Sequence, residues 1–282
     1  MKKILLIGIV LASMSINAQD KKIDSTSNWT KKGTFTLLFN QATFSNWIAG
    51  GENSVSGTLN INYDFNYKKG NWAWDNKIIG RYGISNISGT GTRKTDDLFE
   101  FNSLVSKKAS NNWSYSFFAN VRSQFTTGYD YSTPTKTPTT EFFAPGFVTT
   151  GPGMVYKKSD NFSINLSPAT AKATFVSSRF TDNGAAFGVD QGETSRYELG
   201  FYTAIYYKAT LMENVTVENI FNAYSNYLED AKNIDINYQI NFVMQINKYL
   251  STNLNLHMIA DDNVSSRVQF KQLFGLGVNY IF

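Results

Sequence analysis

The C-terminal segment alternates between two kinds of side chain up to its last residue. Apolar side chains occupy every second position: Phe274, Leu276, Val278, Tyr280 and Phe282. The positions between them are mostly small or polar: Leu273, Gly275, Gly277, Asn279 and Ile281. Successive side chains of a strand point to opposite faces, so this segment is expected to form a strand with one continuous apolar face. Such a strand invites aggregation at a free edge in water, whereas the closing strand of a lipid-embedded barrel requires it.

The same five apolar residues resemble the C-terminal recognition signal of bacterial outer-membrane barrels, with a terminal Phe, an aromatic residue two positions earlier and apolar residues at alternate sites before it. This resemblance implies that the outer-membrane assembly machinery handles the chain during insertion.

The N-terminal residues have the pattern of a secretory signal peptide. Lys2 and Lys3 precede an apolar run, and small residues follow up to Ala18. We expect residues 1–18 to be removed, residues 19–32 to form a short periplasmic segment, and residues 33–282 to form the barrel. A membrane anchor is disfavoured because the apolar run is shorter than the ~20 residues that a spanning helix needs. The chain contains no cysteine, so we expect neither a lipid-modified N-terminus nor disulfides.

The alternation predicts an all-β, antiparallel up-and-down barrel of about twelve strands. The predicted strands are 34–41, 54–68, 72–84, 97–105, 113–126, 147–156, 162–173, 196–208, 215–225, 233–247, 251–260 and from about 269 onward. The sixth is the least regular, because Pro152 lacks a ladder donor, and Leu166-Ser167-Pro168 is expected to interrupt the seventh. The links alternate between short and generally longer, which is typical of short periplasmic turns and longer extracellular loops. A soluble β-sandwich, the alternative, does not account for both chain ends.

Aromatic side chains gather beside the predicted short turns. Trp72, Trp74 and Trp113 begin strands just after such turns, and Tyr63 and Tyr67 precede one. Trp and Tyr suit membrane interfaces, so these residues predict an aromatic belt at the periplasmic side.

The predicted inner face contains six acids and six bases. They are Asp64, Asp75, Glu100, Glu198, Glu218 and Asp235, with Lys77, Arg81, Arg122, Arg196, Lys208 and Lys271. This balance argues against strong ion selectivity, which needs a ring of one sign. The interior is either cross-linked and mostly filled, or a narrow water-filled path. The large inward residues Phe118, Tyr202, Tyr206 and Tyr224 favour partial obstruction.

Sequence features of enzymes, cofactor sites and nucleic-acid partners are weak. The single histidine, His257, is expected to point inward without a serine at a pairing distance on its face. Asp261 and Asp262 could bind calcium but are more typical of a solvated loop. We therefore predict no catalytic residue, no cofactor and no resident metal. The net charge of +4 gives no argument for nucleic acid.

The loops contain motifs that resemble a known family. These are Trp47-x-x-Gly50-Gly51-x-Asn53, Lys94-Thr95-Asp96-Asp97, Ser123-Gln124-Phe125 with Gly128-Tyr129, Ala144-Pro145-Gly146, Leu166-Ser167-Pro168 and Gly184-Ala185-x-Phe187-Gly188-Val189. In this order they resemble the Bacteroidota outer-membrane proteins of domain-of-unknown-function family 3078. The resemblance implies a fold and a location, and no catalytic residue.

The resulting prediction is an outer-membrane barrel in contact with lipid, with a narrow channel or small-solute transport function. The alternative is a structural or accessory barrel whose apolar loops dock protein partners of an outer-membrane assembly. An outer-membrane hydrolase is a remote third hypothesis.

Overall fold

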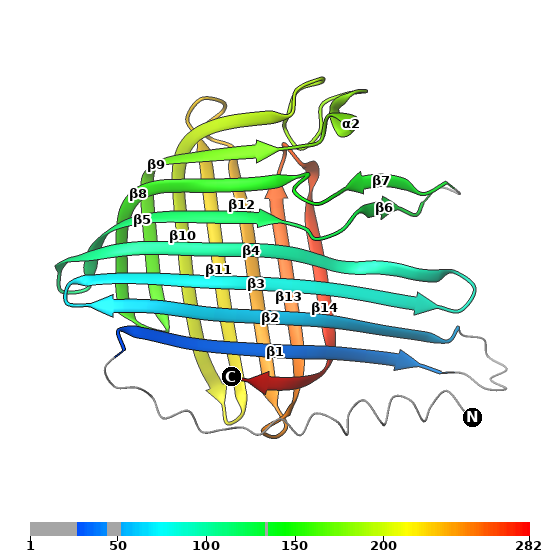
Figure 1. The fold of residues 1–282 in the computed structure, drawn as a ribbon, viewed down its shortest axis with the longest axis horizontal. Helices are drawn as coiled ribbons and strands as arrows, with labels where there is room; N and C mark the ends of the chain where they lie inside the picture. The colour runs from blue at the N-terminus through cyan, green and yellow to red at the C-terminus, as the bar shows by residue number, and fades with distance from the viewer. Residues whose placement is uncertain (1–26, 44–51, 133–134) are drawn as a thin grey trace.

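The computed structural model describes residues 27–43, 52–132 and 135–282. The predicted signal peptide, most of the predicted periplasmic segment and the Trp47–Gly51 motif lie outside these residues. Within them the chain forms one closed antiparallel barrel of twelve strands, which confirms the predicted fold class (Figure 1). The barrel strands are β1 (Trp29–Ala42), β2 (Ser54–Lys69), β3 (Trp72–Ile87), β4 (Gly91–Ser110), β5 (Trp113–Ser123), β8 (Gly146–Ser159), β9 (Phe162–Phe175), β10 (Ser195–Met212), β11 (Val215–Asn226), β12 (Ile234–Gln245), β13 (Leu250–Asp261) and β14 (Ser265–Ile281).

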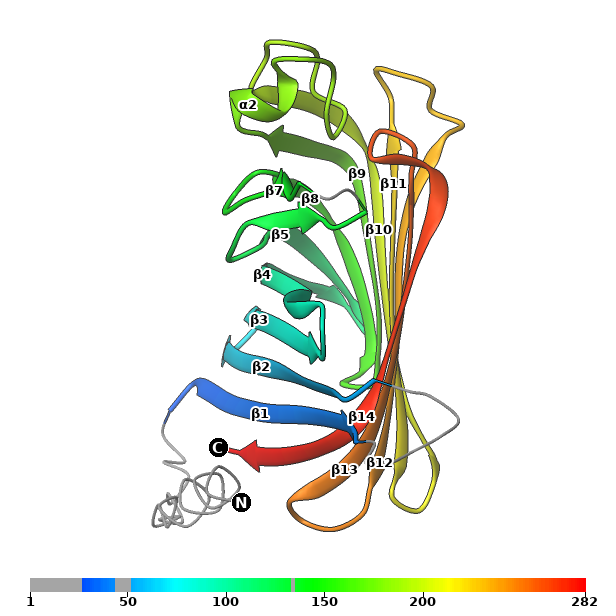
Figure 2. The same cartoon turned by 90° about the vertical axis from the view of Figure 1, so that its right-hand side faces the viewer.

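Pairing of the first and last strands closes the barrel. β1 pairs with β14 from Thr34 opposite Ile281 to Phe39 opposite Leu276. The N–H of Gly33 donates to the carbonyl oxygen of Phe282 at 2.7 Å, and the N–H of Phe282 donates back at 3.0 Å. Tilted strands on opposite walls run in crossed directions, as the two layers in Figure 1 and the turned view in Figure 2 show. Closure pairs the two terminal strands over these six positions, as a lipid environment requires of sheet edges.

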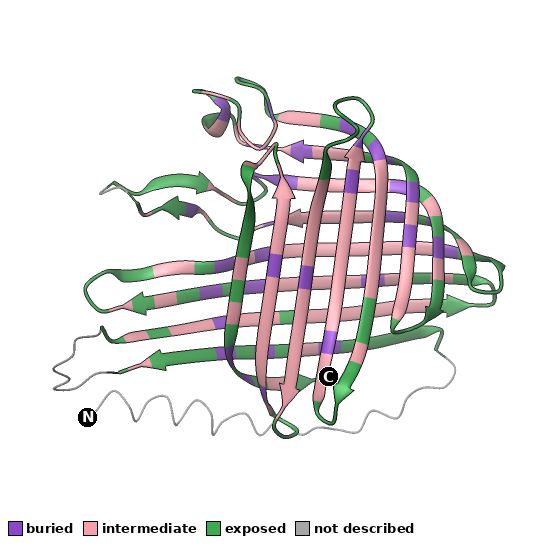
Figure 3. Cartoon of the chain, turned by 180° about the vertical axis from the view of Figure 1, so that it is seen from behind, coloured by how far each residue is buried: buried purple, intermediate pink, exposed green. Residues whose placement is uncertain are grey.

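The barrel is apolar outside and polar inside. Large exposed apolar side chains follow the outer face of the strands, among them Phe35, Leu37, Tyr115, Phe117, Tyr197, Leu199, Phe274, Leu276 and Val278. Among the described residues, buried polar or charged side chains outnumber buried apolar ones by eighteen to nine. Most strand positions are neither fully buried nor fully exposed, and the buried ones are isolated bands (Figure 3). This distribution reverses that of a water-soluble domain and matches a barrel with a polar lumen.

The two ends of the barrel differ in the length of their links. Tight links of two to four residues, 70–71, 111–112, 160–161, 213–214 and 246–249, connect the strands at one end. Residues 124–145 and 176–194 project from the other end, which lies to the upper right in Figure 1. Within them lie a small hairpin, β6 (Gly128–Asp130) with β7 (Thr137–Thr140), and the single turn α2 (Ser178–Thr181). The long links 124–145 and 176–194 agree with the prediction. The links 88–90 and 262–264 at the same end are three-residue turns, although the predicted links were 85–96 and 261–268, and the β6–β7 hairpin was not predicted.

Several strands extend beyond the predicted limits. β4 begins at Gly91 rather than 97, and β14 at Ser265 rather than about 269. β1 begins at Trp29, four residues before the predicted start of the barrel. These added stretches lack the alternation that the prediction used, as in Gly91-Thr92-Arg93-Lys94. Strand ends that extend beyond the apolar layer contact water on both faces. They keep the backbone pairing of the sheet, but their apolar and polar residues need not alternate.

Two proline-containing strands form with local irregularities. Pro152 lies within β8 opposite Phe117, and the register between β8 and β9 shifts between Thr150 and Met154. Leu166-Ser167-Pro168 was expected to interrupt a strand, but β9 continues through it to Phe175. There three steps along β9 match two along β10, so β9 contains one additional residue. A β-bulge of this kind reverses which residues face the lumen on its two sides.

The described residues contain no helix that is long and apolar enough to cross a membrane.

Candidate functional site: the charged lumen

An ion-pair cluster joins opposite walls of the lumen. Lys271 of β14 places its Nζ 2.8 Å from Oδ1 of Asp96 on β4, and Nε of Arg81 on β3 lies 3.5 Å from Oδ2 of the same carboxylate. β14 and β4 are separated by three strands in the barrel order, so this contact crosses the lumen. The Asp96 side chain is 2% exposed. One buried carboxylate therefore holds two cations from different walls.

A second cluster is centred on Lys172 of β9. Its Nζ lies 2.7 Å from Asp235 on β12, 3.5 Å from Glu198 on β10 and 3.9 Å from Asp261 at the end of β13. The ammonium also lies 5.0 Å from the centre of the Tyr224 ring. Three carboxylates around one ammonium leave an excess of negative charge on this side of the lumen.

The Lys172 cluster continues toward the long-loop end through Arg196. The Arg196 guanidinium pairs with Glu198 at 3.5 Å and with Glu229 in the β11–β12 loop. It also donates to the carbonyl oxygen of Gly188 at 3.0 Å and to Asn263 Oδ1 at 2.8 Å. Arg196 therefore connects the β9–β10, β11–β12 and β13–β14 loops to the rim of the barrel.

Aromatic rings narrow the middle of the lumen. Phe118 of β5 stacks on Tyr202 of β10, with ring centres 4.7 Å apart and the planes 15° from parallel. Tyr202 also donates to Asn222, and Tyr206 donates to Glu218 at 2.9 Å. The expected partial obstruction by Phe118, Tyr202, Tyr206 and Tyr224 agrees with this packing: Phe118 and Tyr224 are buried.

Two adjoining cavities remain within this interior. The first has a volume of about 90 Å³ and is bordered by Glu100, Lys172, Tyr202 and Asp235. The second, of about 400 Å³, is bordered by Arg81, His257 and Lys271. Arg122, Phe147, Ile259 and Asp261 border both, so the cavities share a wall. Side chains therefore fill part of the lumen, and the two cavities leave another part of it open.

Some of the other predicted lumen charges form side-chain contacts, and others lie opposite a residue of the other sign on the neighbouring strand. Asp75 is 3.8 Å from Lys157 of β8, and Glu100 accepts hydrogen bonds from Asn102 and Asn120. Asp64 lies opposite Lys77 in the β2–β3 register, and Lys208 opposite Glu218 in the β10–β11 register. These cross-strand positions are consistent with the predicted inner face.

Lys172, Asp96 and Asp261 are charged residues of the described lumen that the predicted inner face omitted. Counting every second residue from Ile164 and Leu166 places Lys172 on the lipid face, and the bulge after Ser167 turns it inward. Asp96 was omitted because the predicted strand began one residue later. Its alternation with Leu98 and Glu100 on a longer strand would have assigned it correctly.

Motif segments that are distant in sequence meet at the long-loop end. Asp97 accepts hydrogen bonds from the N–H groups of Phe125 at 2.7 Å and Thr126 at 3.0 Å. These bonds turn the chain out of the sheet, which explains why β5 ends at Ser123 rather than at the predicted 126. Ser123 Oγ donates to the carbonyl oxygen of Pro145 at 3.2 Å. The Lys94–Asp97, Ser123–Phe125 and Ala144–Gly146 motifs therefore form one rim of the larger cavity.

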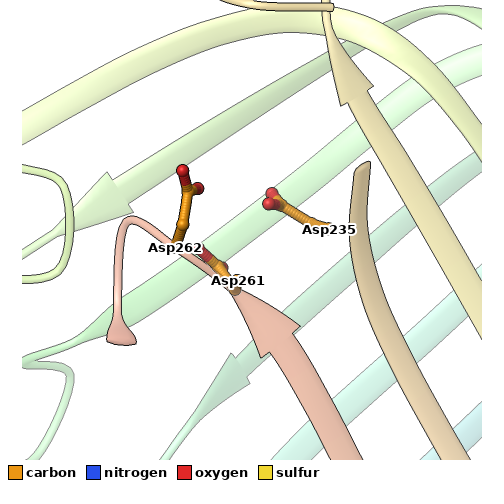
Figure 4. A group of neighbouring side chains, drawn as sticks. All are labelled: Asp235, Asp261 and Asp262. Atoms are coloured by element: carbon orange, nitrogen blue, oxygen red, sulfur yellow. The ribbon is translucent and has the colours of Figure 1, made fainter. Parts of the chain in front are cut away.

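The Asp235, Asp261 and Asp262 carboxylates lie together where β12 begins and β13 ends, with ligand oxygens within 4.8 Å of one another (Figure 4). Oxygen ligands of this kind suit calcium. However, Lys172 already contacts Asp235 and Asp261, so its ammonium supplies the positive charge that an ion would supply. The arrangement is that of a lysine-neutralised acidic cluster.

His257 lies in the lumen, where its Nε2 is 2.9 Å from Asn237 Oδ1. Within the described part of the chain, no serine or threonine hydroxyl hydrogen-bonds to this ring. The pairing of nucleophile and base that a hydrolase needs is therefore not formed around His257 in the described residues.

The aromatic residues predicted to form a belt lie beside the tight turns. Trp72 and Trp74 are exposed near the 70–71 turn, and Trp113 is exposed after the 111–112 turn. Trp29 of β1 extends this group, with its ring centre 5.8 Å from that of Trp74. Their assignment to a membrane interface stays a prediction.

Residues 39–129 match the family model described as "Protein of unknown function (DUF3078)". The match confirms the predicted family resemblance over that segment. No curated protein matches the chain.

Several solved structures resemble the chain at low sequence identity. An outer membrane channel from Pseudomonas putida F1 has 10% identity and a TM-score of 0.40, over 92% of this chain and 99% of that chain. The toluene transporter TodX from Pseudomonas putida has 8% identity and a TM-score of 0.32, over 91% and 88%. OmpF of Salmonella typhi, in complex with daunomycin, has 7% identity and a TM-score of 0.30, over 90% and 97%. Similarities of this size assign no activity. The closed barrel with its apolar outer face identifies the fold as that of an outer-membrane barrel.

Proposed function

We propose that this barrel resides in a bacterial outer membrane and conducts small polar solutes through its charged lumen. The observation that supports this most directly is the pair of adjoining cavities inside a barrel whose outer surface is apolar. The N-terminal pattern favours export by a signal peptide cut after Ala18, and the family match favours an origin in Bacteroidota.

The cross-lumen contacts limit the size of solutes that can pass. A solute has to move past the Asp96 cluster and the Phe118–Tyr202 stack. The conductance is therefore expected to be small compared with that of wide porins, whose barrels of sixteen or more strands leave an open channel.

Planar-bilayer recording of the purified, heat-modifiable barrel tests the proposal, with Arg81→Ala and Arg122→Ala alongside. Both side chains border the larger cavity, so their removal is expected to change the size and the ion selectivity of the conductance steps. A folded barrel that never conducts, either as wild type or as variant, would refute the channel function.

A second candidate function is the docking of protein partners through the long-loop end. Phe142 and Leu228 there are 65% and 70% exposed, which is unusual for loops in water. Capture of the tagged barrel from native membranes would support docking if a stable partner is lost on replacement of Phe142 and Leu228 by serine. Retention of the same partner by this variant would refute it.

A further inference from the structure

The charges of the lumen are balanced in number but separated in space. The bases Arg81, Arg122 and Lys271, from β3, β5 and β14, border the larger cavity. The acids Glu198, Asp235 and Asp261, from β10, β12 and β13, surround Lys172. This grouping of like charges around different parts of the lumen leaves a positive potential in the larger cavity.

The positive charge of the larger cavity is incompletely neutralised. Arg81 and Lys271 share the single carboxylate of Asp96. Among the described residues, Arg122 forms no ion pair: it lies opposite Glu100 in the β4–β5 register, and its guanidinium lies 4.9 Å from the centre of the Phe147 ring. The two acids that border the cavity, Asp97 and Asp261, have lysine partners of their own, Lys94 at 2.7 Å and Lys172 at 3.9 Å.

Arg81 contributes charge to this cavity wall, but its Nε faces Asp96. The residue is 9% exposed, and its buried Nε lies 3.5 Å from Asp96 Oδ2; within the described part of the chain neither atom has a hydrogen-bond partner. Arg122 and Lys271 are therefore the cations that an anion in the cavity would contact first.

One side of the same cavity is apolar. Phe147 at the start of β8, Phe187 in the β9–β10 loop and Ile259 of β13 border it. Phe187 and Gly188 both adopt positive φ, 56° and 78°, as the central residues of the tight turn between Ala186 and Val189. The volume of about 400 Å³ lies in the range of small-molecule sites.

We propose that the larger cavity is a binding site for a small organic carboxylate with an apolar body. Arg122 and Lys271 contact the carboxylate, Arg81 adds positive charge to the wall of the cavity, and Phe147 and Phe187 enclose the apolar part. Guanidinium groups bind carboxylates through two parallel hydrogen bonds, which favours Arg122 as the main anchor. The inference rests on the proposed function, because a solute reaches the cavity through the lumen.

Equilibrium dialysis of the full barrel in an uncharged detergent tests the site with benzoate as the probe. Benzylammonium and benzyl alcohol are the matched probes that lack the negative charge. Benzoate is expected to bind at least about tenfold more tightly than either, since a hydrogen bond to a charged group contributes about 1.5–3 kcal/mol. Arg122→Gln is expected to weaken benzoate binding by about tenfold or more, and Arg122→Lys by less.

The matched control is Lys208→Gln, which removes the same charge near the tight-turn end of the barrel, far from the cavity. It is expected to leave benzoate binding unchanged. Equal affinity for benzoate and benzylammonium in the wild-type barrel would overturn the inference, and so would unchanged binding by folded Arg122→Gln. The comparison of probes uses the wild type alone, so it decides the matter even if a variant does not fold.

Conductance and dialysis separate the two proposals. A barrel that conducts but does not distinguish benzoate from benzylammonium retains the channel function and loses the anion site. A barrel that binds benzoate through Arg122 but never conducts retains the site and loses the channel.

Discussion

Replacement of Lys172 by methionine is expected to lower the free energy of unfolding of the barrel by ~3–5 kcal/mol, the usual cost of removing one partner of a buried ion pair. The Lys172 side chain is 11% exposed and contacts Asp235, Glu198 and Asp261 at 2.7, 3.5 and 3.9 Å. Glu198 retains Arg196 at 3.5 Å, so the uncompensated charge falls on the two aspartates. Urea titration of the barrel in phospholipid vesicles, followed by tryptophan fluorescence, measures the change.

Lys157→Met is the control. This lysine is 46% exposed and pairs with Asp75 at 3.8 Å and Asp160 at 3.2 Å. Water screens such a pair, so the expected loss is no more than about 1 kcal/mol. Equal losses for Lys172→Met and Lys157→Met would contradict the reasoning from burial.

Calcium provides a second outcome of the same experiment. Without the ammonium, the carboxylates of Asp235, Asp261 and Asp262 are free to bind an ion, and calcium at a hundred times its dissociation constant would restore about 2.7 kcal/mol. The wild type is expected to gain much less, because Lys172 occupies the site. If calcium stabilises both proteins equally, Lys172 is not the cation that neutralises this cluster.

Three further perturbations test the packing, the closure and the outer rim. Gly151→Ala places a methyl group 2.8 Å from the carbonyl oxygen of Ala169, so we expect the free energy of unfolding to fall by ~1–3 kcal/mol in the same urea titration. In Gly57→Ala the nearest neighbour of the methyl group is 3.8 Å away, so this control is expected to be near neutral. Deletion of Phe282 removes the backbone pairing with Gly33 and a ring stacked 6.0 Å from Tyr63, so the heat-modifiable fraction is expected to fall; an unchanged fraction would show that closure does not depend on this residue. Asp97→Ala removes the acceptor that holds the N–H groups after β5, so limited proteolysis within 124–145 is expected to become faster than in the wild type.

The sequence determines the barrel because each wall faces two different solvents. Lipid outside and water inside impose a period of two on every strand, and that period alone predicted the twelve strands. It did not predict the β6–β7 hairpin, which lies in the 124–145 loop beyond the barrel wall, where this constraint on the faces no longer applies. The same period did not predict the first residues of β4 and β14. These residues lie beyond the apolar layer, where both faces of a strand contact water and no alternation is required.

The charged lumen was harder to predict, because it depends on where strands deviate from regularity. One extra residue in β9 exchanges the faces of everything after Ser167, and this is what brings Lys172 to Asp235 rather than to lipid. No pattern in the sequence marks that bulge except Pro168, which was interpreted as a break. The predicted residues thus included most of the charges but not the one at the centre of the acidic cluster.

The number of charges was also a poor guide to the field they produce. Six acids and six bases on the inner face predict little selectivity if they are mixed along the lumen. The structure instead groups Arg81, Arg122 and Lys271 around one cavity, and Glu198, Asp235 and Asp261 around Lys172. A field across the lumen orients a solute even where the net charge is near zero. Selectivity in such a barrel therefore follows from which strands supply each sign, and this depends on the register and the barrel closure rather than on composition.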